Sequence, residues 1–393
     1  MSGSGSSDGA HGRFHLFRVS RLRIVHLFRS PVGGIFRHVR DLCDAQAAAG
    51  HEVGIVCDST TGGEYEDRYF RQIADGLPLG VTRTPIQRHV GPGDVAAAWR
   101  TLRIIRAMQP DILHGHGAKG GAYARLFGTA LRMGGSRVLR LYSPHGGSLH
   151  YDADTTAGRF FFSLEALMGR FTDHILFVSE YELRTYKAKV GEPRPPYSLV
   201  YNGVRSEEFA DVAEAPDAAD FLYVGMMRDL KGPDLFLDAL KLVEEGAHRP
   251  LTAVMVGDGD DLEKYKAQAR ELGFGDRVRF FPAMPARQAF ARGRVMVVPS
   301  RAEAMPYIVL EALAAGRALI ATAVGGIPEI FGGSSPALCR PEPVSLAERM
   351  RLALESPGEF ARSMPARDTL RERFGADAMA SRIEDVYCQA MSR

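Results

Sequence analysis

Short apolar segments alternate with helix-forming stretches along almost the whole of this 393-residue chain, and this alternation limits the folds that it can adopt. The segments 22–28 and 295–298 are rich in Val, Ile and Leu, which is typical of strands buried on both faces of a parallel sheet. Helical stretches between such strands form crossover connections that cover both faces of the sheet. The pattern therefore predicts an α/β protein with doubly wound parallel sheets.

The length and the order of the segments predict two domains, because 393 residues exceed one ordinary core. The strand–helix series runs to about residue 201 and restarts at Asp220, after a stretch rich in Ala, Asp and Pro. We expect two Rossmann-like domains that face a central cleft, because ligands bind at the C-terminal ends of such strands. The expected boundaries are a flexible leader at 1–12, an N-terminal domain at 13–208, a linker at 209–219, a C-terminal domain at 220–376 and a final helix at 377–393.

The composition excludes several classes of protein. Apolar residues make up 45% of the chain and charged residues 24%, which are the values of a globular protein. There is no apolar run long enough to span a bilayer, and we expect no signal peptide. The four cysteines lack metal or redox spacing, which predicts a cytoplasmic location. No motif of a nucleic-acid-binding protein is present, so we expect no nucleic-acid partner.

The segment 295–316 carries two carboxylates eight residues apart, Glu303 and Glu311. Pro306 suits the first position of a helix and Gly316 suits the position just past its end. We therefore expect Glu303 on the turn before a helix N-terminus and Glu311 about a turn and a half into that helix. A helix N-terminus attracts phosphate, and carboxylates accept hydrogen bonds from sugar hydroxyls. The segment predicts a site for a nucleoside-diphosphate sugar.

Two further turns follow predicted strands. Gly225 opens a strand-to-helix turn that contains Arg228 and Lys231, two cations placed to hold a diphosphate leaving group. The alternative is that Arg228 and Lys231 are solvated surface residues with no role in binding. Gly33 and Gly34 follow the first strand, where small residues let a substrate approach the backbone closely, although they equally suit a tight turn.

Three histidines fall at or just beyond the ends of strands. His145 lies between a proline and a glycine, in an irregular turn that would expose its ring to the cleft, with a core or capping role as the alternative. His114 and His116 have the spacing of a zinc pair, but no further ligands stand at a suitable distance in the sequence. The acidic stretch 257–261 is interpreted as a turn and a helix start. We therefore expect no metal site.

The chain resembles the retaining glycosyltransferases of family 4, which have the GT-B fold, from about residue 22 to 390. The match is densest at 224–232, 295–316 and 322–330. The spacing of Glu303 and Glu311 is similar to the acidic pair of this family. The resemblance implies that Glu303 lies at the donor sugar and that Glu311 binds the nucleotide ribose.

The resemblance extends to the neighbouring turn residues. Ala304, Met305 and Pro306 stand where the family often has Gly-Phe-Gly, whose backbone N–H groups face the sugar hydroxyls, and Pro306 has no N–H to offer. We include Tyr307, the next residue, in the same donor-binding group.

Four more positions match family motifs. Lys231 matches the phosphate lysine, and Arg228 is expected to supply the charge of the family arginine, because Met226 stands at that arginine's position. His145 matches the family's His-Gly position near the donor. The pair at 33–34 matches the first glycine-rich loop.

The resemblance implies transfer of a hexosyl unit from a UDP- or GDP-sugar with retention of configuration, by a front-side route. We expect no metal and no cofactor, a glycan or lipid-linked acceptor, and a role in polysaccharide or glycolipid biosynthesis. Two alternatives stay open: a nucleotide-sugar epimerase of similar architecture, and a non-catalytic relative that only binds the nucleotide sugar.

The first half of the chain is basic, which predicts a peripheral enzyme on the cytoplasmic face of a membrane. The alternative is that the segment 95–108 is an amphipathic helix packed on its own core. The residues behind the membrane hypothesis are Trp99, Arg100, Arg103, Arg106, Arg125, Arg132, Arg137 and Arg140.

Overall fold

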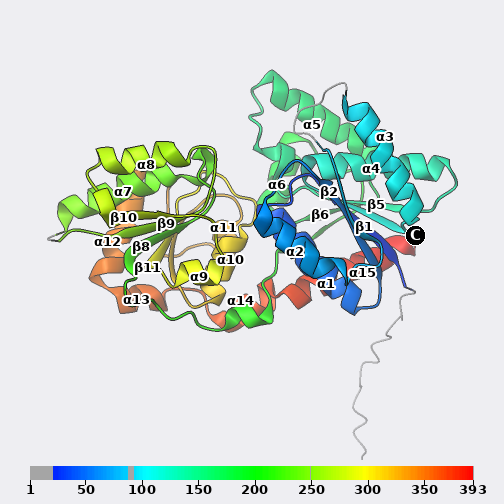
Figure 1. Ribbon diagram of the computed structural model, residues 1–393. Helices are drawn as coiled ribbons and strands as arrows, with labels where there is room; N and C mark the ends of the chain where they lie inside the picture. Colours follow the sequence, from blue (N-terminus) through cyan, green and yellow to red (C-terminus); the bar gives the residue numbers. More distant parts are fainter. Residues whose placement is uncertain (1–20, 87–92, 248, 393) are drawn as a thin grey trace, which may run out of the picture.

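A computed structural model describes residues 21–86, 93–247 and 249–392, and it contains two α/β domains side by side (Figure 1). The expected leader at 1–12 lies outside these residues. The two domains and their parallel sheets confirm the predicted fold class.

The first sheet contains seven parallel strands in the order β3-β2-β1-β4-β5-β6-β7. Its central strands are buried on both faces, as the apolar runs predict. β3 was not predicted, because it is a half-buried edge strand with Gly and Thr in place of an apolar run. The strands are β1 (Arg23–Phe28), β2 (Glu52–Asp58), β3 (Gly80–Thr84), β4 (Ile112–His116), β5 (Leu139–Ser143), β6 (His174–Phe177) and β7 (Tyr197–Leu199).

Helices cover both faces of this sheet (Figure 1). On one face α1 packs against β1 and β2, and on the other face α3 and α4 pack against β1 and β4. The helices are α1 (Gly33–Ala48), α2 (Glu64–Ala74), α3 (Gly93–Met108), α4 (Gly117–Met133), α5 (Thr156–Met168) and α6 (Glu180–Lys189), with short 3₁₀ turns η1 (Gly147–His150), η2 (Gly169–Phe171) and η3 (Ser206–Phe209).

The second sheet contains six parallel strands in the order β10-β9-β8-β11-β12-β13. The strands are β8 (Ala219–Val224), β9 (Ala253–Val256), β10 (Val278–Phe281), β11 (Gly293–Val298), β12 (Ala318–Thr322) and β13 (Leu338–Cys339), of which only the two-residue β13 was not predicted. The helices are α7 (Pro233–Gly246), α8 (Leu262–Glu271), α9 (Ala286–Phe290), α10 (Tyr307–Ala314), α11 (Ile327–Ile330), α12 (Pro343–Glu355), α13 (Pro357–Arg362) and α14 (Arg367–Phe374), with 3₁₀ turns η4 (Asp229–Lys231) and η5 (Gly275–Arg277).

The last helix, α15 (Ala376–Met391), returns to the first domain and lies along α1 (Figure 1). Its buried side chains Ile383, Val386 and Tyr387 pack in one cluster with Leu22 and Ile24 at the start of the first sheet. The predicted crossover of the C-terminal helix is confirmed.

Candidate active site

A cavity of about 1040 Å³ lies between the two domains, at the C-terminal ends of strands from both sheets. Every residue predicted for the site lines this cavity. They are Gly33, Gly34 and His145 from the first domain, and Gly225, Arg228, Lys231, Glu303, Ala304, Met305, Pro306, Tyr307 and Glu311 from the second.

Glu303 lies on the loop between β11 and α10, before the helix N-terminus as expected. Its carboxylate is buried, and its Oε1 accepts hydrogen bonds from the Ser300 hydroxyl at 2.7 Å and from the Lys231 Nζ at 2.6 Å. Helix α10 begins at Tyr307, one residue after Pro306, and ends before Gly316, which has a φ of +72°. The loop therefore places a helix N-terminus, which is a general attractor of anions, beside a carboxylate and an ammonium group.

Lys231 reaches this point from the turn between β8 and α7. The turn ends in Gly232, whose φ is +68° and whose added Cβ would lie 2.2 Å from the Pro299 carbonyl oxygen. Only glycine allows this close approach, which brings η4 against the loop of Glu303. Arg228 is exposed on the same turn and also lines the cavity. The two cations therefore stand on one wall, as the sequence predicted.

The residues 304–307 connect the two domains as well as lining the cavity. The Met305 carbonyl oxygen accepts a hydrogen bond from the Asn202 side chain at 2.8 Å. The Tyr307 hydroxyl lies 3.1 Å from Nδ1 of His38, on α1. A Cβ added to Gly34 would lie 3.4 Å from the Tyr307 ring, so the glycine-rich start of α1 passes close to the N-terminus of α10.

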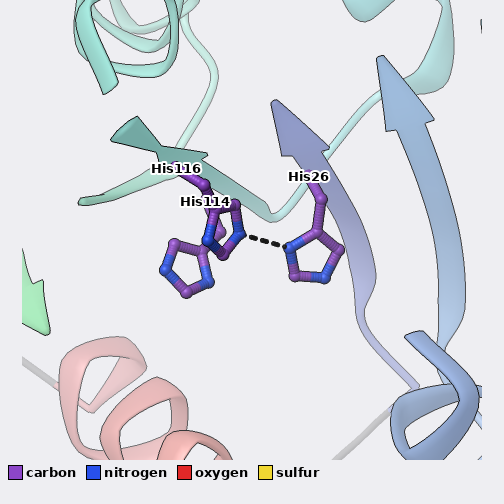
Figure 2. A group of neighbouring side chains, drawn as sticks. All are labelled: His26, His114 and His116. Atoms are coloured by element: carbon purple, nitrogen blue, oxygen red, sulfur yellow. Dashed lines mark hydrogen bonds between the residues drawn. The ribbon is translucent and has the colours of Figure 1, made fainter. Parts of the chain in front are cut away.

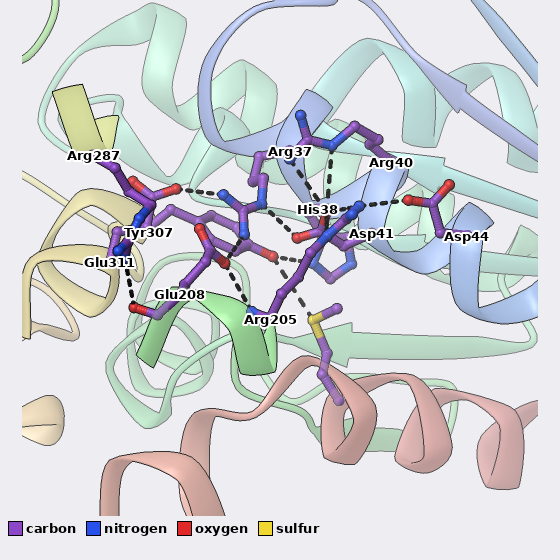
Figure 3. Close-up of polar contacts among 11 residues, drawn as sticks. Arg37, His38, Arg40, Asp41, Asp44, Arg205, Glu208, Arg287, Tyr307 and Glu311 are labelled. Carbon is purple, nitrogen blue, oxygen red and sulfur yellow. Dashed lines mark hydrogen bonds and ion pairs between the residues drawn. The ribbon is translucent and has the colours of Figure 1, made fainter. Parts of the chain in front are cut away.

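Glu311 is held across the cleft by Arg37 of α1, whose Nη1 donates to Glu311 Oε1 at 2.6 Å (Figure 3). The same guanidinium donates to Asp41 at 2.5 Å and to Glu208 on η3. Arg205 joins the group by donating to Asp41 Oδ1 at 2.7 Å. Burial raises the pKa of Glu311 to about 7, and Arg37 opposes this shift. Glu311, the residue predicted to bind the nucleotide ribose, is therefore part of an ion-pair network between the domains.

Five histidines meet where the strands of the first sheet end at the cavity. His26 on β1 stands opposite His114 on the neighbouring β4. His26 Nδ1 lies 3.0 Å from His116 Nε2 (Figure 2), and His116 Nδ1 lies 3.1 Å from His145 Nε2. His38 lies beside His145, with ring centroids 4.8 Å apart.

His114 and His116 do have further potential ligands nearby, contrary to the prediction from their spacing in the sequence. The ring nitrogens of His26, His114 and His116 lie within 4.8 Å of one another, as do those of His38, His116 and His145. Parallel pairing of β1 and β4 brings together residues that are far apart in the chain. Hydrogen bonds account for both ring nitrogens of His26, His114 and His116.

Burial keeps these rings neutral. It lowers the pKa of His26 and of His38 to about 4, and it lowers the pKa of His114, His116 and His145 well below the ordinary value. A neutral imidazole has one N–H donor and one acceptor nitrogen, so each hydrogen bond determines the direction of the next.

The orientation of the Gln46 side-chain amide sets the tautomer of His145 through a chain of hydrogen bonds. The Gln46 side-chain amide donates to the Tyr387 hydroxyl, so its Oε1 accepts from His26 Nε2–H at 2.8 Å. His26 Nδ1 must then accept from His116 Nε2–H, and His116 Nδ1 must accept from His145 Nε2–H. The remaining nitrogen of His145, Nδ1, is therefore a hydrogen-bond acceptor, and His145 lines the cavity.

The backbone at His145 is strained, with a φ of +49° in a residue that has a side chain. Glu182 holds the turn: its carboxylate accepts hydrogen bonds from the backbone N–H groups of Gly146 and, at 2.9 Å, of Val178. Burial raises the pKa of Glu182 to about 7. The neighbouring packing thus stabilises a conformation that exposes His145 to the cavity, as the sequence predicted.

Acidification is expected to destabilise the fold through the buried histidines. His26 has a pKa of about 4 when folded and an ordinary value of 6.5, so between these values the unfolded chain binds more protons. The stability that it contributes is present above pH 6.5 and is lost as the pH falls toward 4. At pH 5 the loss is about 2 kcal/mol for this one residue.

Urea unfolding at pH 7 and pH 5 measures this effect. The difference between the two free energies of unfolding should shrink by about 2 kcal/mol in His26→Phe relative to the native protein. The raised pKa of Glu182 acts in the opposite direction, but it is common to both proteins and cancels. An equal pH difference in both proteins would refute the assignment.

Several residues at the site had not been predicted from the sequence. Arg37 and His38 lie three and four residues after Gly34 on α1, and proximity to the glycine pair was the available signal. Glu208 had no local signal, because its role depends on contacts between domains. His150 lines the cavity from η1, and burial lowers its pKa while Glu303 opposes the shift.

The fold and this cleft define a two-domain glycosyltransferase, and comparison with known families agrees. Residues 32–208 match the family model described as Glycosyltransferase Family 4, and residues 204–373 match the model described as Glycosyl transferases group 1. The chain belongs to this family of glycosyltransferases. The predictions of the family and of an enzyme of the hexosyltransferase class are confirmed.

Relatives of similar length include the glycogen synthase of Mycobacterium tuberculosis, which is 23% identical over 387 residues, covering 91% of this chain and 92% of the relative. The D-inositol 3-phosphate glycosyltransferase of Streptomyces avermitilis is 31% identical over 234 residues, covering 53% of this chain and 49% of that protein.

Solved structures share the GT-B fold. HepE of Anabaena, in complex with UDP and glucose, superposes with a TM-score of 0.77 at 16% identity, covering 94% of this chain and all of the other. WaaG, a glycosyltransferase involved in lipopolysaccharide biosynthesis, superposes with a TM-score of 0.69 at 18% identity, covering 93% and 99% of the two chains.

Proposed function

We propose that this enzyme transfers a hexosyl unit from a UDP- or GDP-sugar to a glycan or lipid-linked acceptor, with retention of configuration and without a metal. The observation that carries the proposal is the Lys231–Glu303 ion pair at the N-terminus of α10, inside the cleft between the domains. The domain at 220–376 would hold the donor, and the domain at 13–208 would bring the acceptor.

The residues of the two walls suit the parts of a nucleoside-diphosphate sugar. The diphosphate would lie at the N-terminus of α10, with Lys231 and Arg228 offsetting the charge that grows as the sugar–phosphate bond breaks. Glu311 would accept the ribose hydroxyls, because a carboxylate can do so while one of its oxygens still contacts Arg37. Glu303 would accept sugar hydroxyls on the opposite side of the diphosphate.

His145 would position the hexosyl unit. Its Nδ1 is an acceptor, so it can receive a hydrogen bond from a sugar hydroxyl but cannot donate a proton to the leaving group. The proton of the acceptor hydroxyl would then pass to the departing phosphate oxygen on the same face of the sugar, which gives retention. The proposal extends to polysaccharide or glycolipid biosynthesis in the cytoplasm.

A panel of UDP-, GDP- and ADP-sugars, with release of nucleoside diphosphate as the readout, tests the proposal. We expect release from one nucleotide class, at a rate that EDTA leaves unchanged. An epimerase would convert the sugar without releasing nucleoside diphosphate, and a non-catalytic relative would bind one donor and release nothing. Either result, or loss of activity with EDTA, would contradict the proposal.

A further inference from the structure

The helices α3 and α4 cover one face of the first sheet, and α5 is joined to α4 by the ion pair between Arg125 and Glu165 (Figure 1). The outer side of these three helices carries large apolar side chains in contact with solvent. They are Trp99 on α3, Leu126 and Met133 on α4, and Phe160, Leu164 and Leu167 on α5, between 41% and 86% exposed.

The exposed side chains of α5 form a continuous stripe. Phe160, Leu164 and Leu167 are spaced four and three residues apart, so they lie one above another on a single side of the helix. Another side of α5 is also apolar, because Phe162 and Met168 are buried against the domain. Isolated exposed apolar residues are common, but a helix that is apolar on both sides needs a second partner.

The surface of the same helices is positively charged. Exposed arginines on or beside these helices are Arg100, Arg103, Arg106, Arg137, Arg159 and Arg170. Among the side chains that the structure describes on α3, α4 and α5, the one acidic group is Glu165, which is buried in an ion pair with Arg125. The exposed acids Asp152 and Asp154 lie in the loop before α5.

Four of the arginines that the sequence suggested are exposed here, namely Arg100, Arg103, Arg106 and Arg137, and the other three are not. Arg125 is buried on Glu165, and Arg132 and Arg140 both pair with Asp173. All three arginines are therefore paired within the domain, although Arg132 and Arg140 share the single negative charge of Asp173. The segment 95–108 also packs its own core through Ile105 and Met108, as the alternative interpretation held. Trp99 nevertheless faces solvent, with the Arg103 guanidinium 5.4 Å from its ring centroid.

We propose that the outer side of α3, α4 and α5, called here the α3–α5 face, lies on an anionic lipid bilayer. The apolar side chains would enter the headgroup region while the arginines contact lipid phosphates. This inference rests on the proposed function and adds where the acceptor meets the enzyme. Helix α5 follows η1, whose His150 lines the cavity, so this face would hold the cleft near a lipid-linked acceptor.

Charge favours a bilayer over a second copy of the chain. In a two-fold dimer the same patch would face itself, which would set arginines against arginines. An anionic lipid surface, by contrast, would attract all of the exposed arginines on this face. None of the helices that the structure describes has the length and apolar character to cross a bilayer, so the attachment would be peripheral.

Sedimentation of the full chain with vesicles of phosphatidylcholine, alone or with 30% phosphatidylglycerol (about that fraction suffices for a negative surface), tests this inference. We expect binding to the anionic vesicles at low salt, weaker binding as salt is added, and little binding to the neutral vesicles. No binding of the native chain to anionic vesicles at low salt would overturn the inference.

Two sets of variants assign the binding to this face. Phe160→Ser/Leu164→Ser/Leu167→Ser and Arg100→Gln/Arg103→Gln/Arg106→Gln should each weaken binding at least about ten-fold. The matched charge control is Arg270→Gln/Arg362→Gln/Arg382→Gln, which removes exposed arginines from α8, α13 and α15. The apolar control is Val344→Ser on α12, where the side chain is 61% exposed. Both controls should bind like the native chain.

Two further outcomes would overturn the inference. One is equal binding by all variants, and the other is a native dimer in light scattering that becomes a monomer in the apolar triple variant. Release of nucleoside diphosphate from the donor, measured without vesicles, should be unchanged in every variant. This second readout separates a failure of the membrane inference from a failure of the proposed function.

Discussion

Replacing Lys231 or Glu303 by alanine is expected to lower the rate of nucleoside diphosphate release by about 100-fold or more. Lys231 is the more exposed end of the ion pair with Glu303, and its ammonium would stabilise charge that develops only in the transition state. Glu303 positions that ammonium at 2.6 Å and would bind the donor sugar itself. Initial rates with the donor identified by the panel measure both effects.

The comparison needs variants that change charge without touching the site. Lys266→Ala and Glu263→Ala remove the two charges of an ion pair within α8 in the same domain, and their rates should match the native rate. Lys231→Arg keeps the charge but changes its shape, so it should retain more activity than Lys231→Ala. Normal rates in both site variants, with thermal unfolding showing that each is folded, would remove these residues from the site.

Replacing Arg37 by methionine is expected to lower the free energy of unfolding by about 3 kcal/mol. Arg37 contacts Asp41, Glu208 and Glu311, and its side chain is only 14% exposed. Removing it leaves three acidic groups close together without their shared cation. Because the three come from α1, η3 and α10, the variant should also loosen the contact between the domains and raise the KM for the donor.

Urea unfolding measures the stability effect, and Arg184→Met is the matched control. Arg184 forms an exposed pair with Glu180 on α6, so its loss should cost about 0.5 kcal/mol or less. Arg37→Lys should recover only part of the stability, because an ammonium cannot contact three carboxylates in the geometry of a guanidinium. Equal stability of Arg37→Met and the native protein would show that the network does not hold the domains together.

The second-domain wall of the cavity could be predicted from the sequence because its signals are local. An apolar strand, a loop with Glu303 and a helix framed by Pro306 and Gly316 form one uninterrupted segment. Gly225 and Lys231 likewise lie within one strand-to-helix turn. In each case a short stretch of chain contains both the structural element and the residue that it positions.

The interdomain contacts could not be predicted in the same way. Arg37 and Glu311 are 274 residues apart, and their pairing depends on how two separately folded domains meet. The histidine cluster likewise depends on which strands are neighbours, since His26 and His116 are 90 residues apart. Arginine burial was also misjudged: Arg125 looked like surface charge until its partner Glu165, on another helix, was known.

The configuration of the newly formed glycosidic bond tests the central claim most directly. With the donor and acceptor in hand, proton NMR of the product at early times distinguishes an α-linked from a β-linked hexosyl unit. An α-linked donor should give an α-linked product, as expected for a front-side route through Lys231, Arg228 and the α10 N-terminus. A β-linked product would contradict the proposed mechanism.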